Sequence, residues 1–567
     1  MDYDTIIVGG GSSGCVMAHR LSAKPENKVL LLEAGPDTPP GAVPTDILAS
    51  YHLSAANPRF KWMKFFATLQ PIRHNAPHRP PPQFYEQGRV MGGGSSINYT
   101  AANRGTPDDY NEWESLGAKG WSWDGVVPFF RRMETDQQFD GPLHGKDGPL
   151  PIRRIPREAW APIAEAAGQA FEAGGLRFIP DQNAMFDDGY FPVTTNNLNN
   201  QRVSAAIAYL DAKTRARPNL TIVSGAQAKR ILFEGPRAVG VEVHLDDGRE
   251  VTHHAREIVC TAGAAHTPAL LMRSGVGPGH HLREMGIDVV ADIPALGQNL
   301  QDHPGIGVFS FLPRRMRLYT DGPYIQVAAR YSSNYPNCGK QDMYCSVIPR
   351  ALWHAVGQRT LSLATWLNKP YSRGQVKLRS PKWDDEPVVE VNMLSDERDL
   401  ERLKFALKWV LAMYEQDPLR RAVREVFSTG WNRRSQMVAL VSARSKAITG
   451  AVAGLLDVAG PLRKAVIEEI MLGEDIRAKI AAGGDAALEE HVMRHTLSIR
   501  HLSCTARMGR DDDPTTVTDN QGRVRGLGGL RIADTSLFPC VPRANTNIPV
   551  IMTAEKVADA AVNSPRN

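Results

Sequence analysis

The stretch "TIIVGGGSSG" near the start of the chain narrows the possible folds more than any other. Thr5–Val8 is β-branched at all four positions and apolar at three, as in a parallel strand buried on both faces. Gly9, Gly11 and Gly14 follow in G-x-G-x-x-G spacing, and the apolar positions after them, up to Leu21, recur as in a helix. Such glycines let backbone N–H groups approach a pyrophosphate, and the helix N-terminus adds its dipole.

A second strand and an acidic residue complete this unit. Val29–Leu32 is apolar throughout and ends at Glu33, which lies 19 residues after Gly14. An acidic side chain at this place can bind ribose hydroxyls. A glycine-rich turn that binds nothing would leave Glu33 without a role, so we predict a dinucleotide site. Flavoproteins often begin with this motif, which favours FAD over NAD.

Composition and charge exclude other classes of protein. At 567 residues the chain is too long for one ordinary core, so we expect two domains or one large composite. It carries 66 basic and 61 acidic side chains, and a net charge of +5 argues against a nucleic-acid partner. Its six cysteines are scattered without a C-x-x-C pair, so we expect neither a disulfide framework nor a zinc site.

Targeting signals are also missing from the sequence as given. The first residues read directly into the predicted strand, so we expect no secretory signal. No apolar run approaches the roughly 18 residues of a membrane span. We therefore expect a cytoplasmic protein with no transmembrane segment. The tandem pairs His253-His254 and His280-His281 are interpreted as solvated rather than metal-binding, because adjacent residues do not readily converge on one ion.

A second glycine-rich segment lies at Glu86–Gly105, "EQGRVMGGGSSINYTAANRG". Its three consecutive glycines, followed by Ser95 and Ser96, fit poorly inside a regular helix or strand. Backbone of this kind can lie flat against a planar ring or a phosphate. Apolar residues flank it closely, which does not suit a flexible linker.

Three segments of the chain resemble the signatures of the glucose–methanol–choline (GMC) oxidoreductases. Gly88-Arg89-x-x-Gly92-Gly93-Gly94-Ser95-Ser96-x-Asn98 resembles their first signature, and Gly263–Gly277 their second. "GLRIADTSLFP" with "NTNIPVIMTAEKVADA", together spanning 529–560, resembles their C-terminal flavin-contacting segment. The motifs extend from residue 9 to residue 560, so the resemblance covers almost the whole chain. Shorter stretches, such as "DQNAMFDDGYFP" and "WLNKP", are similar to family members that act on furanic alcohols.

The resemblance implies an α/β (α+β composite) fold. A Rossmann-like FAD-binding domain would comprise 1–156, 203–305 and 495–567, and an interleaved substrate domain, 157–202 and 306–494, would hold an antiparallel sheet with helices. The residue pattern is compatible with this division. The segment 218–245 is interpreted as a β-meander with turns at Gly225 and Gly235-Pro236, and 256–275 as a strand, a turn and a helix.

The chemistry that the resemblance implies is the oxidation of an alcohol. The alcohol loses its O–H proton, whose pKa is close to that of water, roughly 15.7. A carbon-bound hydride passes to flavin N5. His501 falls where the family places its catalytic histidine, and Asn545 where it has a second polar residue. We therefore predict His501 as base and Asn545 as hydrogen-bond donor to the alcohol oxygen. Protonated His501 would later stabilise superoxide-like charge if oxygen is the acceptor. A lone histidine is otherwise more often a core residue.

The resemblance also implies which residues hold the cofactor and the substrate. The predicted cofactor contacts are Gly9, Gly11, Ser12, Ser13, Gly14, Glu33, Ala34, Arg89, Met91, Gly93, Gly94, Asn98, Tyr99, Ala228, Ala262, Gly263, Asp534, Asn545 and Thr546. The predicted substrate contacts are Tyr99, Trp366, His501 and Asn545, with simple core packing as the alternative for Trp366. Some family members attach FAD covalently through a histidine at the position of Ile97; isoleucine cannot do so, which predicts non-covalent FAD.

Three features depart from the family pattern or stay unassigned. Cys504 stands where the family usually has glycine, and we expect a small, inert, buried thiol rather than a nucleophile. The direction of the Arg500 side chain is open. The segment 444–480 contains the apolar and small-residue run 448–459, which we interpret as a lid over the substrate entrance, a dimer contact, an interfacial helix or an ordinary helical hairpin.

The sequence thus predicts an FAD-dependent oxidase of a primary alcohol, with an aryl or furanic alcohol favoured and O2 reduced to H2O2. One alternative is an alcohol dehydrogenase that passes electrons to a quinone or another carrier. Further alternatives are a flavin-containing lyase, a flavoprotein without alcohol turnover, and a Cys–His hydrolase that uses Cys504. A homodimer is possible.

Overall fold

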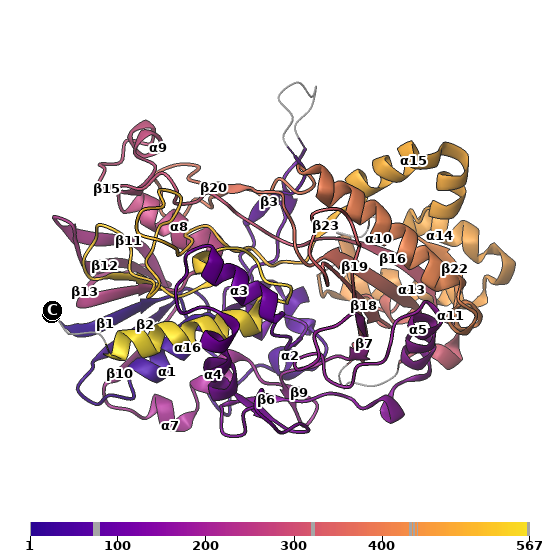
Figure 1. Ribbon diagram of the computed structural model, residues 1–567, viewed down its shortest axis with the longest axis horizontal. Helices are drawn as coiled ribbons and strands as arrows, with labels where there is room; N and C mark the ends of the chain where they lie inside the picture. Colours follow the sequence, from indigo (N-terminus) through magenta and orange to yellow (C-terminus); the bar gives the residue numbers. More distant parts are fainter. Residues whose placement is uncertain are drawn as a thin grey trace.

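The chain forms two seven-stranded sheets that lie at opposite ends of the molecule (Figure 1). The computed structural model describes residues 2–71, 80–318, 324–429, 434, 437–438 and 440–563. The structure also contains smaller sheets. One has four strands: β3 (Phe66–Thr68), β4 (Gln83–Phe84), β20 (Gln375–Lys377) and β21 (Val388–Glu390). The others are pairs: β5 (Glu134–Asp136) with β6 (Leu150–Ile152), β8 (Asn197–Leu198) with β9 (Gln201–Arg202), and β14 (Val276–Gly277) with β15 (Ala291–Asp292).

The first sheet confirms the predicted Rossmann-like unit. Its strand order is β10-β2-β1-β13-β12-β11, with β24 beside β13, and the strands β10, β2, β1, β13 and β24 run parallel. The strands are β1 (Tyr3–Val8), β2 (Val29–Glu33), β10 (Leu220–Ser224), β11 (Ala226–Glu234), β12 (Arg237–Leu245), β13 (Glu250–Cys260) and β24 (Leu530–Ile532). Because β1 and β2 are apolar at successive positions, both faces of this sheet are covered.

Helices cover both faces of the first sheet, and successive residues of β1 point to opposite faces. Ile7 packs in one apolar cluster with α1 (Ser12–Leu21) and α16 (Asn547–Asn563). Ile6 and Val8 point the other way, toward α8 (Gly263–Arg273) and the β11–β12 hairpin. This period of two is the geometry of a strand buried on both sides. The remaining helices near this sheet are α2 (Thr45–Leu48), α3 (Pro107–Ser115), α4 (Trp123–Met133), α6 (Ala205–Tyr209), α7 (Ala212–Arg215) and α9 (Gly279–Glu284).

The prediction of a meander over 218–245 is correct at one of its two turns and wrong at the other. The turn at Gly235-Pro236 does connect an antiparallel hairpin, β11 with β12, and β12 pairs on with β13. At Gly225, however, the chain does not form a hairpin, because β10 pairs parallel with β2 at the opposite edge of the sheet. A turn residue between two β-rich runs signals a change of direction, but it does not show which strand each run will pair with.

The second sheet is antiparallel, with the strand order β22-β16-β19-β18-β17-β7 and β23 beside β16. Its strands are β7 (Gly189–Pro192), β16 (Pro304–Phe311), β17 (Val327–Tyr331), β18 (Met343–Ile348), β19 (Thr360–Leu367), β22 (Arg424–Phe427) and β23 (Leu497–Ser498). Figure 1 shows the helices α5 (Pro162–Ala173), α10 (Glu397–Glu415), α11 (Asp417–Ala422) and α15 (Ile476–His495) gathered around it.

The two faces of this second sheet have different tasks. On β19, Leu361, Leu363 and Leu367 pack into the large apolar core formed with α5 and α10. The alternate residues Ser362 and Ala364 line a cavity instead. The sheet therefore forms one wall of that cavity, and its helices support it from behind.

The segment 444–480 is helical, as one of the interpretations of the sequence expected. It forms α13 (Ala443–Val458), α14 (Arg463–Met471) and the start of α15. Asp457 fixes α13 to the segments that follow β16 and precede β19, through ion pairs with Arg317 and Arg359, the latter at 2.8 Å. Among the described residues, none of the helices is long and apolar enough to cross a membrane.

Candidate active site

One large cavity, of about 930 Å³, lies between the two sheets. Its wall begins at the glycine loop after β1, passes the segment around Gly93, and ends at His501 and Asn545 beneath the second sheet. The carboxyl ends of parallel strands are where open α/β sheets bind ligands, and β1 and β2 both end at this cavity.

Close backbone packing explains two glycines of the predicted cofactor site. A Cβ atom at Gly14 would lie 1.9 Å from the carbonyl oxygen of Gly9, so α1 packs directly on the loop that precedes it. A Cβ atom at Gly93 would lie 2.7 Å from the Cα atom of Gly11, and the φ angle of Gly93 is +52°. The two glycine-rich segments predicted from the sequence therefore meet, backbone against backbone.

Glu33 lies at the end of β2, as predicted, and lines the cavity. Its carboxylate accepts hydrogen bonds from the backbone N–H groups of Gly10, at 2.8 Å, and Gly35, at 2.7 Å. Burial raises the pKa of this carboxyl. Each carboxylate oxygen can accept a second hydrogen bond, so the predicted ribose contact is compatible with this geometry.

Asp534 lies on the cavity wall, but its carboxylate is already engaged. One oxygen accepts from the N–H of Gly263 and the hydroxyl of Thr267, and the other from the N–H and the hydroxyl of Ser536. These four donors occupy all the acceptor positions of the group. Asp534 therefore holds the start of α8 against the C-terminal segment, rather than offering a free carboxylate to a pyrophosphate.

Most of the other predicted cofactor residues lie on the cavity wall, but three lie behind it. Those on the wall are Gly9, Gly11, Ser12, Ser13, Ala34, Gly93, Gly94, Asn98, Tyr99, Ala228, Ala262, Gly263, Asn545 and Thr546. Gly14, Arg89 and Met91 are not part of the described wall. Met91 is fully buried in the core around α1, and Arg89 reaches out to Asp246 at 3.3 Å. Met91 and Arg89 thus support the glycine segments from the side away from the cavity.

The donor set of the cavity fits FAD. The helices α1 and α16 both begin at its wall, and the N-terminus of α1 has no side-chain cap. Half-buried Asn547, at the start of α16, has a buried Nδ2 group without a partner among the described residues, while its Oδ1 accepts from Ser12. Uncapped helix N-termini with glycine backbone beside them are suited to an anionic group such as a pyrophosphate.

At the other end of the cavity, His501 is flanked by Asn545 and by a second histidine. The Nε2 atom of His501 lies 3.2 Å from Nδ2 of Asn545, as the predicted pairing requires. Its Nδ1 atom lies 2.7 Å from Nδ1 of His303, a residue that the sequence did not single out. Burial lowers the pKa of His303 to about 4, and burial with the nearby His303 and Arg500 lowers that of His501 well below its usual range.

The surroundings decide which nitrogen of His501 carries its proton. Two neutral imidazoles can share an Nδ1–Nδ1 hydrogen bond only if one of them donates. The Nδ2 group of Asn545 can only donate, so Nε2 of His501 accepts from it and the proton of His501 lies on Nδ1. His303 Nδ1 then accepts from His501, and the Nε2 lone pair of His501 is left for the cavity, where Asn545 now donates to it.

A buried carboxylate holds both histidines in place. Asp302 accepts hydrogen bonds from the backbone N–H groups of His303, at 2.8 Å, and His501, at 2.9 Å. It also accepts from the hydroxyl groups of Tyr85 and Ser498. Burial raises the pKa of Asp302, and these donors oppose that rise.

Strand pairing explains why residues 198 positions apart meet here. Pro304 of β16 pairs with Ser498 of β23, and Gln301 forms an isolated bridge with Ser503. Continuing the latter register brings His303 opposite His501. No local signal in the sequence predicts that pairing.

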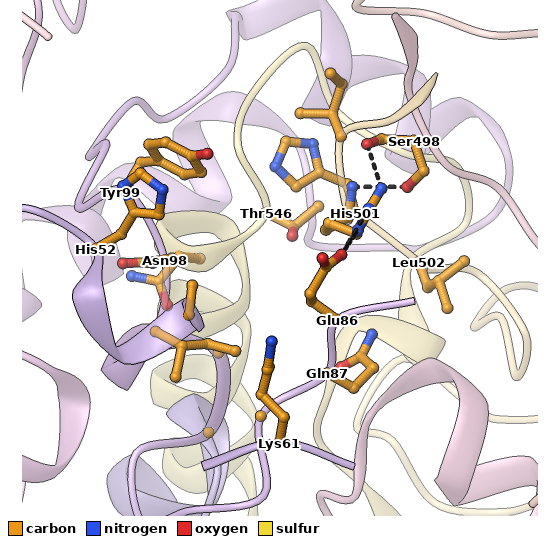
Figure 2. A pocket seen from close by; sticks show the side chains of 18 of the residues that line it. His52, Lys61, Glu86, Gln87, Asn98, Tyr99, Ser498, His501, Leu502 and Thr546 are labelled. Atoms are coloured by element: carbon orange, nitrogen blue, oxygen red, sulfur yellow. Dashed lines mark hydrogen bonds and ion pairs between the residues drawn. The ribbon is translucent and has the colours of Figure 1, made fainter. Parts of the chain in front are cut away.

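Arg500, whose direction the sequence left open, points along the cavity wall. Its guanidinium pairs with Glu86 at 2.6 Å and donates to the carbonyl of Ser498 at 2.7 Å (Figure 2). In the same view Lys61 projects its ammonium into the cavity between Asn98 and Glu86. The sequence reasoning missed both Lys61 and Glu86, because charged residues in a loop are ordinarily solvated.

Aromatic rings form a second part of the wall. Trp366 stacks on Tyr344 with ring centroids 4.6 Å apart, and both line the cavity. Its Nε1 donates to Asn368 at 2.9 Å, so the ring is held in one orientation. Across the cavity, Tyr99 lies against His52 with centroids 4.0 Å apart. Trp366 is buried in a core cluster and also faces the cavity, so its contact with a substrate stays a prediction.

Cys504 has the backbone conformation that glycine prefers. Its φ angle is +75°, in the left-handed region, which explains why a glycine suits this position. The thiol is fully buried, and burial raises its pKa to about 12. A thiol that stays protonated at neutral pH is a poor nucleophile.

We expect the Cys504→Ala variant to retain at least about half of the wild-type turnover, because the thiol takes no part in the chemistry. The check is steady-state turnover together with titration of the native protein with a thiol reagent, in which Cys504 should not react. Complete loss of activity with FAD still bound would revive the Cys–His hydrolase alternative.

Two groups of carboxylates and imidazoles lie outside the cavity. They are Glu134, Asp136 and His144, and Glu474, His491 and His495. In the first, Arg104 and Arg154 neutralise the carboxylates, and carboxylate contacts raise the pKa of His144 to about 10 despite its burial. In the second, Lys479 already holds Glu474 at 2.8 Å. Both groups are accounted for by ion pairing, and the expectation of no metal site stays a prediction.

Comparisons with known proteins agree on one family. Residues 3–305 and 370–554 match the two family models described as GMC oxidoreductase. A 5-(hydroxymethyl)furfural oxidase of Methylovorus sp. (strain MP688) is 40% identical over 98% of this chain and 98% of its own. An oxygen-dependent choline dehydrogenase of Sinorhizobium fredii is 31% identical over 99% and 95%. The crystal structure of pyridoxine 4-oxidase from Mesorbium loti superposes with a TM-score of 0.81 at 26% identity, covering 99% of this chain and 100% of that one.

Proposed function

Since this chain belongs to the GMC oxidoreductases, and is thus an FAD-dependent oxidoreductase, we propose that it oxidises an aryl or furanic primary alcohol to the aldehyde with O2 as electron acceptor. The observation that carries the proposal is the His501–Asn545 pair, which lines the same cavity as the Trp366–Tyr344 stack. The first supplies the base that an alcohol needs, and the second a flat apolar wall.

In this proposal the residues of the chain handle the proton of the alcohol. His501 accepts it at Nε2, while Asn545 turns its amide N–H to the alcohol oxygen and fixes it. His303 accepts the hydrogen bond from Nδ1 of His501, so the base keeps one tautomer and one orientation. When bound, FAD supplies the acceptor for the hydride that leaves the carbinol carbon.

The relatives and the charges of the cavity support the substrate class. One relative is named for a hydroxymethyl furan. Another is named for choline, but a quaternary ammonium ion would meet Lys61 and Arg500 in this cavity, which disfavours it here. The second candidate function, an alcohol dehydrogenase that passes electrons to a quinone, shares the same chemistry at the alcohol.

Anaerobic flavin bleaching tests the proposed function. The holoenzyme is mixed without oxygen with benzyl alcohol, 5-(hydroxymethyl)furfural and 1-butanol in turn, and air is then admitted. We expect the two aromatic alcohols to bleach the flavin fastest, and air to restore its colour with one H2O2 per flavin. Bleaching that only a quinone reverses would favour the dehydrogenase, and no bleaching by any alcohol would contradict the proposal.

We propose that the FAD is held without a covalent bond, because Ile97 lies on the cavity wall and its side chain offers no nucleophile. Acid precipitation of the purified holoenzyme should therefore leave nearly all of the flavin in the supernatant. Yellow colour that stays with the protein pellet would contradict this.

Replacement of Trp366 with Leu should change substrate preference more than turnover. Loss of an aromatic contact worth about 0.5–1.5 kcal/mol lowers the ratio of kcat/KM for benzyl alcohol to that for 1-butanol by roughly 2- to 10-fold. Trp409→Leu is the matched control, because Trp409 stacks on Tyr331, outside the described cavity wall, with centroids 4.0 Å apart. An equal fall in the ratio for both variants would show that only stability had changed.

Two expectations about the larger architecture stay predictions. The division into 1–156, 203–305 and 495–567 against 157–202 and 306–494 is supported by the two separate sheets, although β23 belongs to the second sheet. A role for 444–480 at the entrance is supported by Met471, at the end of α14, which lines the cavity. The dimer and the cytoplasmic location are likewise untested.

A further inference from the structure

Lys61 is an almost fully buried cation that forms no ion pair with the described residues. Its side chain is 5% exposed, and its ammonium makes no hydrogen bond or ion pair with any residue that the structure describes. It lies 5.2 Å from the centre of the Phe84 ring, and Glu86 and Arg500 are near enough to act on its charge. Burial lowers its pKa from the usual value. A buried charge is normally paired, so this ammonium calls for an anion in the cavity.

Arg500 places a second cation in the same region, next to the base. It precedes His501 in the chain, and its positive charge contributes to the low pKa of His501. Glu86 pairs with Arg500 at 2.6 Å, but it is one carboxylate beside two cations. Lys61, Glu86 and Arg500 all line the cavity, and Figure 2 shows Lys61 and Glu86 facing it together. On the cavity wall these three side chains are two cations and one carboxylate, while the Asp302 carboxylate, which also acts on Arg500, lies behind the described wall.

Building on the proposed function, we propose that Lys61 and Arg500 form a carboxylate subsite, and that the preferred substrate is an aromatic primary alcohol with a carboxylate on its ring. One such anion gives the Lys61 ammonium a partner at the cavity wall. The guanidinium of Arg500 retains N–H groups beyond those used by Glu86 and Ser498, and all three N–H groups of Lys61 are available. The aromatic wall of Trp366 and Tyr344 then holds the ring.

A phosphate of FAD is the other source of negative charge near Lys61, because Lys61 forms a bridge with Gly88, whose backbone packs against Gly93. The two sources predict different results when Lys61 is replaced. If it binds a substrate carboxylate, the variant loses substrate preference. If it binds the cofactor, the variant loses affinity for FAD.

The test compares 4-(hydroxymethyl)benzoate with its neutral isostere 4-(hydroxymethyl)benzamide in anaerobic flavin reduction by the holoenzyme. We expect the limiting rate divided by the apparent Kd to be about tenfold or more higher for the carboxylate, as for a charge-assisted hydrogen bond. The carboxylate-to-amide ratio of this quantity should fall as salt is added. If the wild type prefers the amide or shows no preference, the subsite is refuted, while bleaching by the amide still supports the proposed function.

Variants then assign the preference to residues. Lys61→Met and Arg500→Met should each lower the carboxylate-to-amide ratio by about tenfold, and Lys61→Arg should restore much of it. Lys64→Met is the matched control, because Lys64 is exposed on the same segment and should leave the ratio unchanged. A lower FAD content in Lys61→Met with an unaltered ratio would assign Lys61 to the cofactor and overturn the proposal.

Binding to the wild type avoids reliance on variants that fold poorly. The non-reactive 4-methylbenzoate should inhibit reduction competitively and perturb the flavin spectrum, with a Kd about tenfold below that of 4-methylbenzamide. Equal binding of the two compounds would contradict a carboxylate subsite.

Discussion

His501→Ala should slow anaerobic flavin reduction by about 10²- to 10⁴-fold, the usual contribution of a positioned general base. Asn545 is expected to hold the alcohol oxygen, and His501 is the one described group that contacts its Nδ2. No second base is therefore placed to take the alcohol proton. FAD should remain bound, because its predicted contacts extend along the far part of the cavity. The measurement is stopped-flow bleaching with benzyl alcohol at saturating concentration.

The control for this prediction is His280→Ala, since the His280 side chain is 87% exposed and outside the described cavity wall. Wild-type kcat/KM should also have an acid limb well below pH 6.5. The base works in its neutral form, and its pKa is lowered, so activity persists until the pH falls through that lowered value. Undiminished bleaching by His501→Ala would refute the assignment of the base.

His303→Ala should slow flavin reduction by about 10- to 100-fold, even though His303 is fully buried and does not line the described cavity wall. The variant leaves Nδ1 of His501 without its partner at 2.7 Å, which typically costs about 1–3 kcal/mol. It also permits the tautomer with the proton on Nε2, which cannot act as a base toward the alcohol. His303 is a positioning residue in this account, and the readout is the reduction rate as a function of pH.

The pH profile separates positioning from a purely structural role. His303 contributes to the low pKa of His501, so its removal should move the acid limb of the profile upward. Burial, the largest cause of the shift, persists, so the limb should stay below pH 6.5. His303→Asn keeps a possible acceptor and should recover part of the rate. A reduced rate with an unmoved acid limb would indicate a structural effect alone.

Local sequence patterns predicted the elements that form the predicted cofactor site. Gly9, Gly11 and Glu33 lie where the strand–loop–helix–strand pattern placed them, because that pattern is set by residues close in the sequence. The same holds for the strand, turn and helix around Gly263. The error at Gly225 has the same origin, since local turn residues say nothing about β10 reaching β2.

Contacts between distant segments could not be predicted from local sequence patterns. The motif located His501 and Asn545, but His303 meets His501 only because the chain pairs around the Gln301–Ser503 bridge. Likewise, the charges of Lys61, Glu86 and Arg500 come from three segments that the fold brings together. Asp534 was predicted on the correct wall, yet its hydrogen bonds to Gly263 and Ser536 show that it ties loops together.

The alternation along β18 and β19 separates two kinds of evolutionary constraint within single strands. Ser346, Ser362 and Ala364 face the cavity, whereas their neighbours Val347 and Leu363 belong to the packed core. Mutations at the first set alter which alcohols fit and leave the core volume intact. Descendants of one ancestral enzyme can thus diverge in substrate range at every second position, while the positions between them stay fixed by packing. A mutant library confined to the cavity-facing residues would follow the same route and lose few members to misfolding.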